Sequence, residues 1–312
     1  MVDHDFGGPW TEIKLDAVEY YLECYTKALK RVGFDLTYID AFAGTGSRDV
    51  EREVGGILEG VPIRIVKETL EGSARRALAV NPPFDHLIFI EKSETRCAAL
   101  RELKDEYPSR DINVITGEAN QVLRNLVRQQ PWVRKDKGNS RGVVFLDPYA
   151  LHVEWETLQA LASTLVFDVW YLFPIRDTIR QLAYDFEGIG PKEPMLDRLL
   201  GQEWRELYSI APETELGVDL FQRPTEPELR RVVSTQQFER WLKGRLLNEF
   251  EFVSDPLPIL QTTTRQLFSL FLCVSNPSKP AIELAEKFVR HVNKKFGPVA
   301  SHRRSGRGAS GR

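Results

Sequence analysis

A chain of 312 residues that is 42% hydrophobic can bury a sizeable core, and its length lies between one large domain and two small ones. Its formal net charge of −3 excludes a global positive field that would draw the whole molecule to nucleic acid, although a local basic patch is compatible with it. No apolar run reaches membrane-spanning length, residues 1–10 show neither the basic nor the apolar region of a secretory leader, and the 3 cysteines lie far apart. We therefore expect a cytoplasmic protein with reduced thiols, no membrane segment and no metal site.

The first part of the chain begins with a helix and a strand. Apolar residues over 10–32 recur at steps of three and four, which predicts an amphipathic helix. A strand follows over Leu36–Ala41. Segment 47–72 is charged and contains a glycine pair, so we interpret it as a loop or small hairpin. A helix capped by Ser73 is then expected to reach about Val80.

Strands and helices alternate regularly beyond this point. The predicted strands have almost no polar interruption, which is typical of a parallel sheet covered by helices on both faces. The expected elements are the strand Asp85–Glu91, the helix Thr95–Tyr107, the strand Ile112–Thr116, the helix Asn120–Gln130, the strand Gly142–Leu146, the helix Trp155–Leu161 and the strand Phe167–Phe173.

The C-terminal part has a different character. Residues 177–248 are charge-rich and broken by prolines, which indicates a helical insertion. The strand-like runs Phe250–Leu260 and Arg265–Val274 predict a hairpin, followed by a helix over Ala281–Phe296. Residues 301–312 contain Gly, Ser and Arg but almost no apolar side chain, so we expect a disordered basic tail.

These elements together predict the fold class. Five alternating strands and a terminal hairpin match the seven-stranded, mostly parallel sheet of the Rossmann-like class I methyltransferase fold, an α/β fold. An NAD-binding sheet fits less well, because its sixth strand arrives by another parallel crossover. We expect one such domain over residues 1–300, which includes the helical insertion.

The most informative motif is TYIDAFAGTGSR, at the end of the first strand. An acid, Asp40, is followed by a small-residue turn with Gly44 and Gly46, where the backbone can approach a ligand closely. Ligands of open α/β sheets lie outside the carboxyl ends of the strands, so this order predicts a nucleotide-like ligand. A plain tight turn is the alternative for the motif taken alone.

Glu91 ends the second strand and is followed by Lys92. A carboxylate at this place can accept hydrogen bonds from both ribose hydroxyls of a nucleoside. The usual interval from the glycine turn is about 20 residues, whereas Glu91 follows Gly46 by 45 residues. Glu91 can therefore occupy the position of this ribose-binding acid only if segment 47–72 forms an excursion from the sheet. A solvated acid at the end of a strand is the alternative.

Glu118 and Ala119 follow the third strand in the sequence TGEA. A polar side chain or a backbone amide there could bind an adenine edge. A helix-capping turn is the alternative, and Gly117 and Asn120 would suit it equally well.

Asp147, Pro148 and Tyr149 follow the fourth strand. An enzyme that methylates an exocyclic or amide nitrogen needs an acceptor for the N–H and a group that holds a planar substrate. Asp147 and the Pro148 region could accept the hydrogens, and Tyr149 could stack on the plane. In isolation an Asp-Pro turn ending a strand is the simpler interpretation, but after Asp40, Gly44 and Glu91 we favour a catalytic role.

The chain resembles the three-Cys-motif partner proteins, a bacterial family that looks like class I S-adenosylmethionine-dependent methyltransferases and is named for a neighbouring protein that carries the cysteines. The resemblance covers most of residues 10–297. It departs at Ala150, where family members tend to have Gly, and at Leu172, where they tend to have Asn. The segments that carry it are WTEIKLDAVEYYLECY, YIDAFAGTGSR, EGSARRAL, FIEKSE, VVFLDPYAL and LFSLFLCVSNPSKPAIELAEKF.

The resemblance implies a role for each motif. Glu91 would hold the cofactor ribose, with Lys92 also at the cofactor, and residues 147–149 would lie by the transferable methyl group. Lys14 on the first helix, which would otherwise be interpreted as a solvated lysine, could reach a ligand carboxylate. The change at Leu172 would remove a polar group from the pocket. The turn that would hold the methionine part of S-adenosylmethionine comprises Asp40, Phe42, Ala43, Gly44, Thr45 and Gly46.

The sequence thus predicts an S-adenosylmethionine-dependent methyltransferase that acts on nitrogen of a nucleobase or nucleic acid, with a three-Cys-motif protein as a candidate partner. A non-catalytic scaffold of the same fold, which binds a nucleotide or a partner protein, is the first alternative. A dinucleotide-dependent oxidoreductase is the second, and the terminal hairpin disfavours it. The sequence indicates no oligomeric state.

Overall fold

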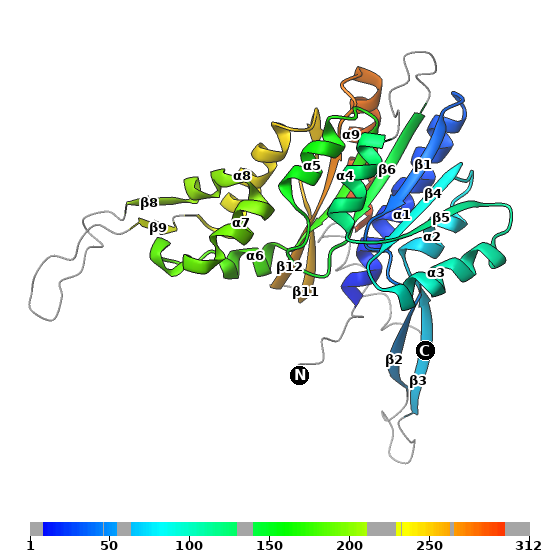
Figure 1. Ribbon diagram of the computed structural model, residues 1–312, viewed down its shortest axis with the longest axis horizontal. Helices are drawn as coiled ribbons and strands as arrows, with labels where there is room; N and C mark the ends of the chain where they lie inside the picture. Colours follow the sequence, from blue (N-terminus) through cyan, green and yellow to red (C-terminus); the bar gives the residue numbers. More distant parts are fainter. Residues whose placement is uncertain are drawn as a thin grey trace, which may run out of the picture.

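The computed structural model describes residues 9–45, 47–54, 64–129, 140–210, 229–231, 233–262 and 265–296. A sheet of eight strands forms its centre, and helices cover both faces (Figure 1). Gly46 and the tail 301–312 lie outside the described residues, so the predictions for them stay predictions.

The elements follow the predicted alternation of helices and strands. The first half contains α1 (Pro9–Lys30), β1 (Asp35–Asp40), β2 (Ser47–Val54), β3 (Arg64–Glu71), α2 (Ser73–Ala79), β4 (His86–Glu91), α3 (Glu94–Glu106), β5 (Asp111–Thr116), α4 (Ala119–Gln129), β6 (Ser140–Leu146), α5 (Trp155–Ala162) and β7 (Phe167–Phe173). The second half contains α6 (Ile175–Gln181), η1 (Phe186–Gly188), η2 (Gly190–Lys192), α7 (Glu193–Leu200), η3 (Gln202–Leu207), β8 (Tyr208–Ile210), β9 (Leu229–Arg231), α8 (Thr235–Leu247), β10 (Phe252–Val253), β11 (Leu257–Thr262), β12 (Arg265–Val274) and α9 (Lys279–Phe296).

The order of the strands fixes the fold class. The parallel strands lie in the order β5, β4, β1, β6, β7, and β12 pairs antiparallel with β7. The chain first builds one side of β1 with β4 and β5, then returns to its other side with β6, which creates a switch point between β1 and β6. A parallel sheet completed by a C-terminal antiparallel hairpin is the Rossmann-like class I methyltransferase arrangement, so the predicted fold class is confirmed.

The predicted number of strands was wrong by one. The segment expected as a single strand over Phe250–Leu260 forms two strands, β10 and β11, which both pair with β12. Between them, the Ser254 hydroxyl accepts a hydrogen bond from the Leu272 amide at 2.9 Å, and the Ser254 amide donates to the Leu272 carbonyl at 2.9 Å. A side chain thus replaces one backbone group of the ladder, and the strand is interrupted there.

The two excursions from the sheet also have defined structure. Strands β2 and β3 form an antiparallel hairpin in which Ser47 pairs with Glu71, so the ends of the excursion meet (Figure 1). This is the hairpin alternative of the sequence prediction. The insertion begins with α6 and is helical through α7 and α8, but it also contains the strand pair β8 and β9.

Two hydrophobic cores explain why the strands lack polar residues. Along the strands, Ile39, Val144 and Val169 face a core shared with α4, α5, α7 and α8. Their neighbours Tyr38, Val143 and others face a second core shared with α1, α2, α3 and α9. Because both faces are covered, almost every side chain of the central strands β1, β4, β6 and β7 is buried. Leu172 lies in the second core, so it does not contribute to a pocket.

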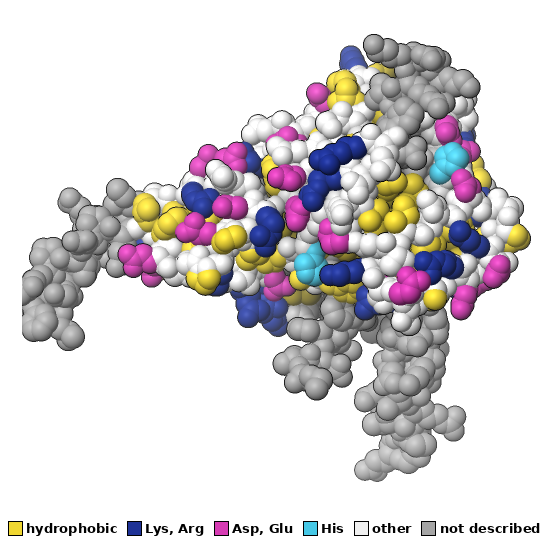
Figure 2. All heavy atoms as spheres, in the orientation of Figure 1, with side chains coloured by type: hydrophobic (Ala, Val, Ile, Leu, Met, Phe, Trp, Pro, Cys, Tyr) yellow, Lys and Arg dark blue, Asp and Glu magenta, His cyan; other side chains and the backbone are white. Residues whose placement is uncertain are grey.

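The surface carries charges of both signs. On the face drawn in Figure 2, Lys and Arg side chains alternate with Asp and Glu over most elements, as expected for a net charge near zero. Within the described residues, no helix combines the length and the apolar character needed to cross a membrane.

Gly142 in β6 tests how closely this sheet is packed. A Cβ atom at Gly142 would lie 2.5 Å from Phe167 Cε1 and 2.9 Å from the Thr37 carbonyl oxygen. We predict that Gly142→Ala lowers the free energy of unfolding by about 1–3 kcal/mol, because the backbone oxygen cannot move aside without disturbing the ladder. Urea unfolding measures the change.

Gly244→Ala provides the matched control. Gly244 lies in α8, and apart from its chain neighbours and the backbone of the helix itself, no atom is within 4 Å of the position that its Cβ would take. The same substitution should there stabilise the protein by about 1 kcal/mol through helix propensity. Equal effects of the two substitutions would contradict the packing described for β6.

Candidate functional site

A cavity of about 590 Å³ lies at the edge of the sheet where the parallel strands end. This volume is within the range of about 300–1,000 Å³ that is typical of small-molecule sites. The cavity is lined by residues that follow β1 (Ala41, Phe42), β4 (Glu91, Lys92, Ser93, Arg96), β5 (Gly117, Glu118, Ala119, Asn120) and β6 (Tyr149, Leu151, His152, Val153, Glu154), and by Met195, Arg198 and Leu199 of α7.

The turn after β1 is shaped by glycine. Gly44 has φ +62°, in the left-handed region that side chains disfavour. The Phe42 amide donates to Asp40 Oδ1 at 3.2 Å, and the Ala43 amide donates to the Ile90 carbonyl at 3.1 Å. The turn is therefore fastened both to its own strand and to β4.

Glu91 joins the turns that follow β1 and β4. Its Oε2 accepts a hydrogen bond from the Gly44 amide at 3.1 Å, and its Oε1 accepts one from the Ser93 amide at 2.8 Å. The side chain is 6% exposed, at the wall of the cavity. Each carboxylate oxygen keeps a lone pair after these bonds, so Glu91 can accept two further hydrogen bonds from a ligand.

Tyr149 and Arg96 cover this junction. Arg96 Nη1 donates to the Tyr149 hydroxyl at 3.1 Å and lies 3.6 Å from Glu91 Oε1. The Arg96 guanidinium carbon is 5.2 Å from the centre of the Tyr149 ring, which is 48% exposed. A Cβ at Gly44 would lie 3.5 Å from the Tyr149 hydroxyl. The aromatic ring is thus positioned beside the glycine turn, and the residue is partly exposed.

Lys14, Asp40 and Asp147 form a charged group beside the cavity rather than in its wall. Lys14 Nζ donates to Asp147 Oδ2 at 2.5 Å, and the two side chains are 13% and 21% exposed. Asp40 is fully buried, and burial raises its pKa to about 7. The hydroxyl of Ser73 and the Phe42 amide oppose this rise, while the Asp147 carboxylate adds to it.

Ser73 has a different role from the predicted one. Gly72, not Ser73, is the N-cap residue of α2, and no side chain caps this helix. The Ser73 hydroxyl instead interacts with the buried carboxyl of Asp40.

Glu118 follows the helix-capping alternative. It accepts hydrogen bonds from the Asn120 and Gln121 amides at 3.1 and 2.9 Å. Burial acts in the opposite direction, but these bonds lower the pKa of the Glu118 carboxyl. Its side chain is occupied by the first turn of α4, although Glu118 and Ala119 both line the cavity.

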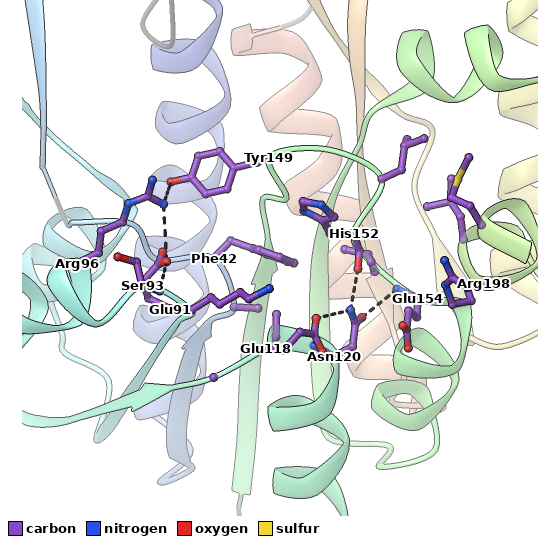
Figure 3. A pocket seen from close by; sticks show the side chains of 18 residues that line it. Phe42, Glu91, Ser93, Arg96, Glu118, Asn120, Tyr149, His152, Glu154 and Arg198 are labelled. Atoms are coloured by element: carbon purple, nitrogen blue, oxygen red, sulfur yellow. Dashed lines mark hydrogen bonds and ion pairs between the residues drawn. The ribbon is translucent and has the colours of Figure 1, made fainter. Parts of the chain in front are cut away.

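Asn120 organises the opposite wall. Its Nδ2 donates to Glu118 Oε1 and to the His152 carbonyl, both at 2.7 Å. Its Oδ1 accepts hydrogen bonds from the Glu154 amide and the Thr157 hydroxyl, both at 2.9 Å. This buried side chain therefore fixes the loop between β6 and α5 that carries His152 and Glu154 to the cavity (Figure 3).

The structure separates the predicted site residues into two groups. Those that line the cavity are Phe42, Glu91, Lys92, Glu118, Ala119 and Tyr149. Those that lie next to it without lining it are Lys14, Asp40, Ala43, Gly44, Thr45, Asp147 and Pro148. The sequence reasoning missed Arg96, Asn120, His152 and Arg198, and only Asn120 carried a sequence signal, as a capping residue. Within the described residues, no group of three or more His, Cys, Asp or Glu could hold a metal ion.

No protein-family model matches the chain, and no curated protein sequence matches it. Solved structures similar to it include protein LPL1258 from Legionella pneumophila, with 15% identity over 94% of each chain and a TM-score of 0.48. M. jannaschii TYW2 in complex with AdoMet is similar at 10% identity over 87% of this chain and 78% of its own, with a TM-score of 0.34.

A third similar structure is an S-adenosylmethionine-dependent methyltransferase from Clostridium acetobutylicum. Its identity is 9% over 85% of this chain and 96% of its own, with a TM-score of 0.33. These similarities show only that the backbones of these proteins follow similar paths. The fold class rests on the strand order, and the reaction has to be inferred from the site.

The buried carboxyl of Asp40 should make stability depend on pH. Its pKa of about 7 lies above the ordinary value of 3.8, so between these values the folded protein binds a proton that the unfolded chain has released. Stability from this group is present below pH 4 and is lost as the pH rises towards 7. We predict that Asp40→Asn makes this decline shallower by about 1.4 kcal/mol per pH unit.

Urea unfolding at several pH values from 4.5 to 8 measures the slope for both proteins. Asp168 serves as an internal reference, because burial raises its pKa to about 7 at the opposite edge of the sheet and the substitution leaves it in place. Part of the decline should therefore persist in Asp40→Asn. Identical slopes in the two proteins would show that Asp40 is ionised in the folded state at these pH values.

Proposed function

We propose that this protein binds S-adenosylmethionine at the strand-end cavity and transfers its methyl group to nitrogen of a nucleobase, free or within a nucleic acid. The observation that carries the proposal is the position of Glu91. Its carboxylate lies at the wall of the cavity, beside the switch point of the sheet, and is held by the Gly44 and Ser93 amides. Nucleoside ligands of open α/β sheets bind at this place.

The residues at the cavity fit such a cofactor. Glu91 retains free acceptor positions for two ribose hydroxyls, and Phe42 and Ala119 supply apolar wall at the ends of β1 and β5. The Gly44 turn lies directly beside Glu91, where the methionine part would be held. Lys14 is paired with Asp147 in this structure. An ammonium group has three N–H donors, so Lys14 could contact a ligand carboxylate and keep its bond to Asp147.

The cofactor would supply an electrophilic methyl group on a sulfonium, which is already a good leaving group, so the residues of the chain mainly position the acceptor. Asp147 would accept a hydrogen bond from the N–H of the acceptor nitrogen. Lys14 orients this carboxylate through its 2.5 Å contact. Tyr149 would stack on a planar base with its exposed face, while Arg96 holds the hydroxyl end of the ring.

The proposed family is that of the three-Cys-motif partner proteins, on the segments quoted from the sequence. Membership would imply a second protein that carries the cysteines and works with this one. The departure at Leu172 does not weaken the site, because this side chain lies in the core shared with α1 and α9.

Replacement of Glu91 tests cofactor binding. We predict that Glu91→Gln weakens the affinity for S-adenosylmethionine about 10- to 100-fold, because the amide keeps one acceptor oxygen and loses the charge. Calorimetry with S-adenosylmethionine, S-adenosylhomocysteine and NAD measures the affinities. Glu283→Gln on α9 is the control, since Glu283 is 64% exposed and far from the cavity. Binding of NAD in preference to both S-adenosyl ligands would point to the oxidoreductase alternative.

Replacement of Asp147 separates chemistry from binding. We predict that Asp147→Ala reduces methyl transfer at least about 100-fold, since a preorganised polar contact to the reacting group is lost, and that the Kd for S-adenosylmethionine changes little. Transfer of tritiated methyl is measured separately into DNA, RNA and lysate protein. Asp177→Ala on α6, a residue that is 53% exposed, is the control. Cofactor binding by the wild type without transfer to any of these acceptors would identify a non-catalytic scaffold.

A further inference from the structure

Helix α7 of the insertion forms the far wall of the cavity. Met195, Arg198 and Leu199 of α7 line it together with Leu151 and other residues of the loop after β6. Figure 3 shows Glu91 and Arg96 on one side of the cavity and Arg198 on the other, with His152 between them. The cavity therefore extends from the nucleoside side near Glu91 to a second side that belongs to the insertion.

Helix α7 presents this wall rigidly. Leu196, Leu199 and Leu200 are buried in the core below it. The Asp197 carboxylate accepts hydrogen bonds from Trp204 Nε1 at 2.8 Å and from Arg205 at 2.5 Å. Arg205 also donates to Glu193 at 2.8 Å. Both acids of α7 are thus used within the insertion, which leaves Arg198 as the charged side chain that α7 offers to the cavity.

The acids of the cavity wall all have partners within the protein. Glu91 accepts bonds from the backbone amides of two turns, and Glu118 from those of α4. Glu154 pairs with Arg124 at 2.5 Å. Among the described residues, by contrast, neither Lys92 nor Arg198 makes a hydrogen bond or an ion pair. The cavity mouth therefore offers two free cations, one on each side, to an anionic ligand.

We propose that Arg198 binds a phosphate group on the far side of the acceptor base and that Lys92, which the sequence assigned to the cofactor, instead binds one on the near side, so that the substrate is a single-stranded nucleic acid and α7 is its docking wall. The choice of a nucleic acid rests on the proposed function. A strand carries phosphates on both sides of each base, whereas a free nucleotide has phosphate on one side only. The apolar side chains Leu151 and Met195 line the same cavity as Arg198 and offer a surface on which a base can pack. Arg198 is a positioning residue, and its planar guanidinium suits a phosphate group.

Fluorescence anisotropy with a fluorescein-labelled oligonucleotide of about 20 nucleotides, as single strand and as duplex, tests the proposal without any methyl transfer. Arg198→Gln should weaken binding of the single strand about 5- to 10-fold. It should also reduce the slope of log K against log salt by about 0.7, the value for one lost phosphate contact on a single strand. Arg198→Lys keeps the charge and should keep the slope.

Arg180→Gln is the matched control within the insertion. Arg180 lies on α6, is 69% exposed and does not line the cavity. The Arg180→Gln variant should bind the oligonucleotide with the same affinity as the wild type and with the same slope of log K against log salt. Because Arg198 is exposed and makes no hydrogen bond or ion pair within the part of the chain that the structure describes, its substitution should also leave the thermal unfolding midpoint unchanged.

Three results would overturn the proposal. They are equal affinity of wild type and Arg198→Gln, absence of binding to any oligonucleotide, and displacement of the oligonucleotide by nucleoside 5′-monophosphates at equal concentration. Two further outcomes distinguish a failure of this inference from a failure of the proposed function. If the wild type binds single strands through Arg198 but transfers no methyl group, the docking inference stands and the methyltransferase function is refuted. If Arg198→Gln transfers methyl groups with the same KM as the wild type, the methyltransferase function stands and the docking inference is refuted.

Discussion

The hydrogen bonds that the Glu91 carboxylate accepts from the Gly44 and Ser93 amides connect the two strand ends on which the site depends. They require β4 to lie directly beside β1, which is possible because the hairpin of β2 and β3 returns to its starting point. They also require the left-handed backbone at Gly44. The Glu91 carboxylate therefore holds the turn after β1 against the turn after β4. Its remaining lone pairs can still accept hydrogen bonds from a ligand in the cavity.

The remaining charges are arranged around this junction in two distinct ways. Asp40, Asp147 and Lys14 lie beside the cavity. The Asp40 carboxyl is buried, with a pKa raised by that burial, and the Asp147 carboxylate is held by Lys14. Among the described residues that line the cavity, the acids accept bonds from backbone amides or from an arginine, whereas Lys92 and Arg198 make no hydrogen bond or ion pair. A polar site of this kind suits a ligand with hydroxyl groups inside and negative charge at its rim.

The insertion completes the site that the sheet begins. The sheet supplies the nucleoside side, which is common to many ligands of open α/β folds. Helix α7 supplies the other side, and its position is set by buried leucines and by the contacts of Asp197 with Trp204 and Arg205. Selection of a substrate would thus depend on residues outside the parallel sheet, whereas cofactor binding would depend on residues within it.

The sequence by itself determined the alternation of strands and helices, because continuous burial on both faces leaves an apolar run that can be read locally. It also indicated that Asp40, Glu91 and Asp147 lie at the carboxyl ends of strands and hence at one edge of a parallel sheet, whereas the adjacency of these strands came from the tertiary structure. Only the tertiary structure decided that Lys14 pairs with Asp147, 133 residues away, and that Ser73 faces Asp40 instead of capping α2. Arg96 and Arg198 reach the cavity from opposite sides through packing of α3 and α7, and local periodicity records burial but not which distant side chains meet.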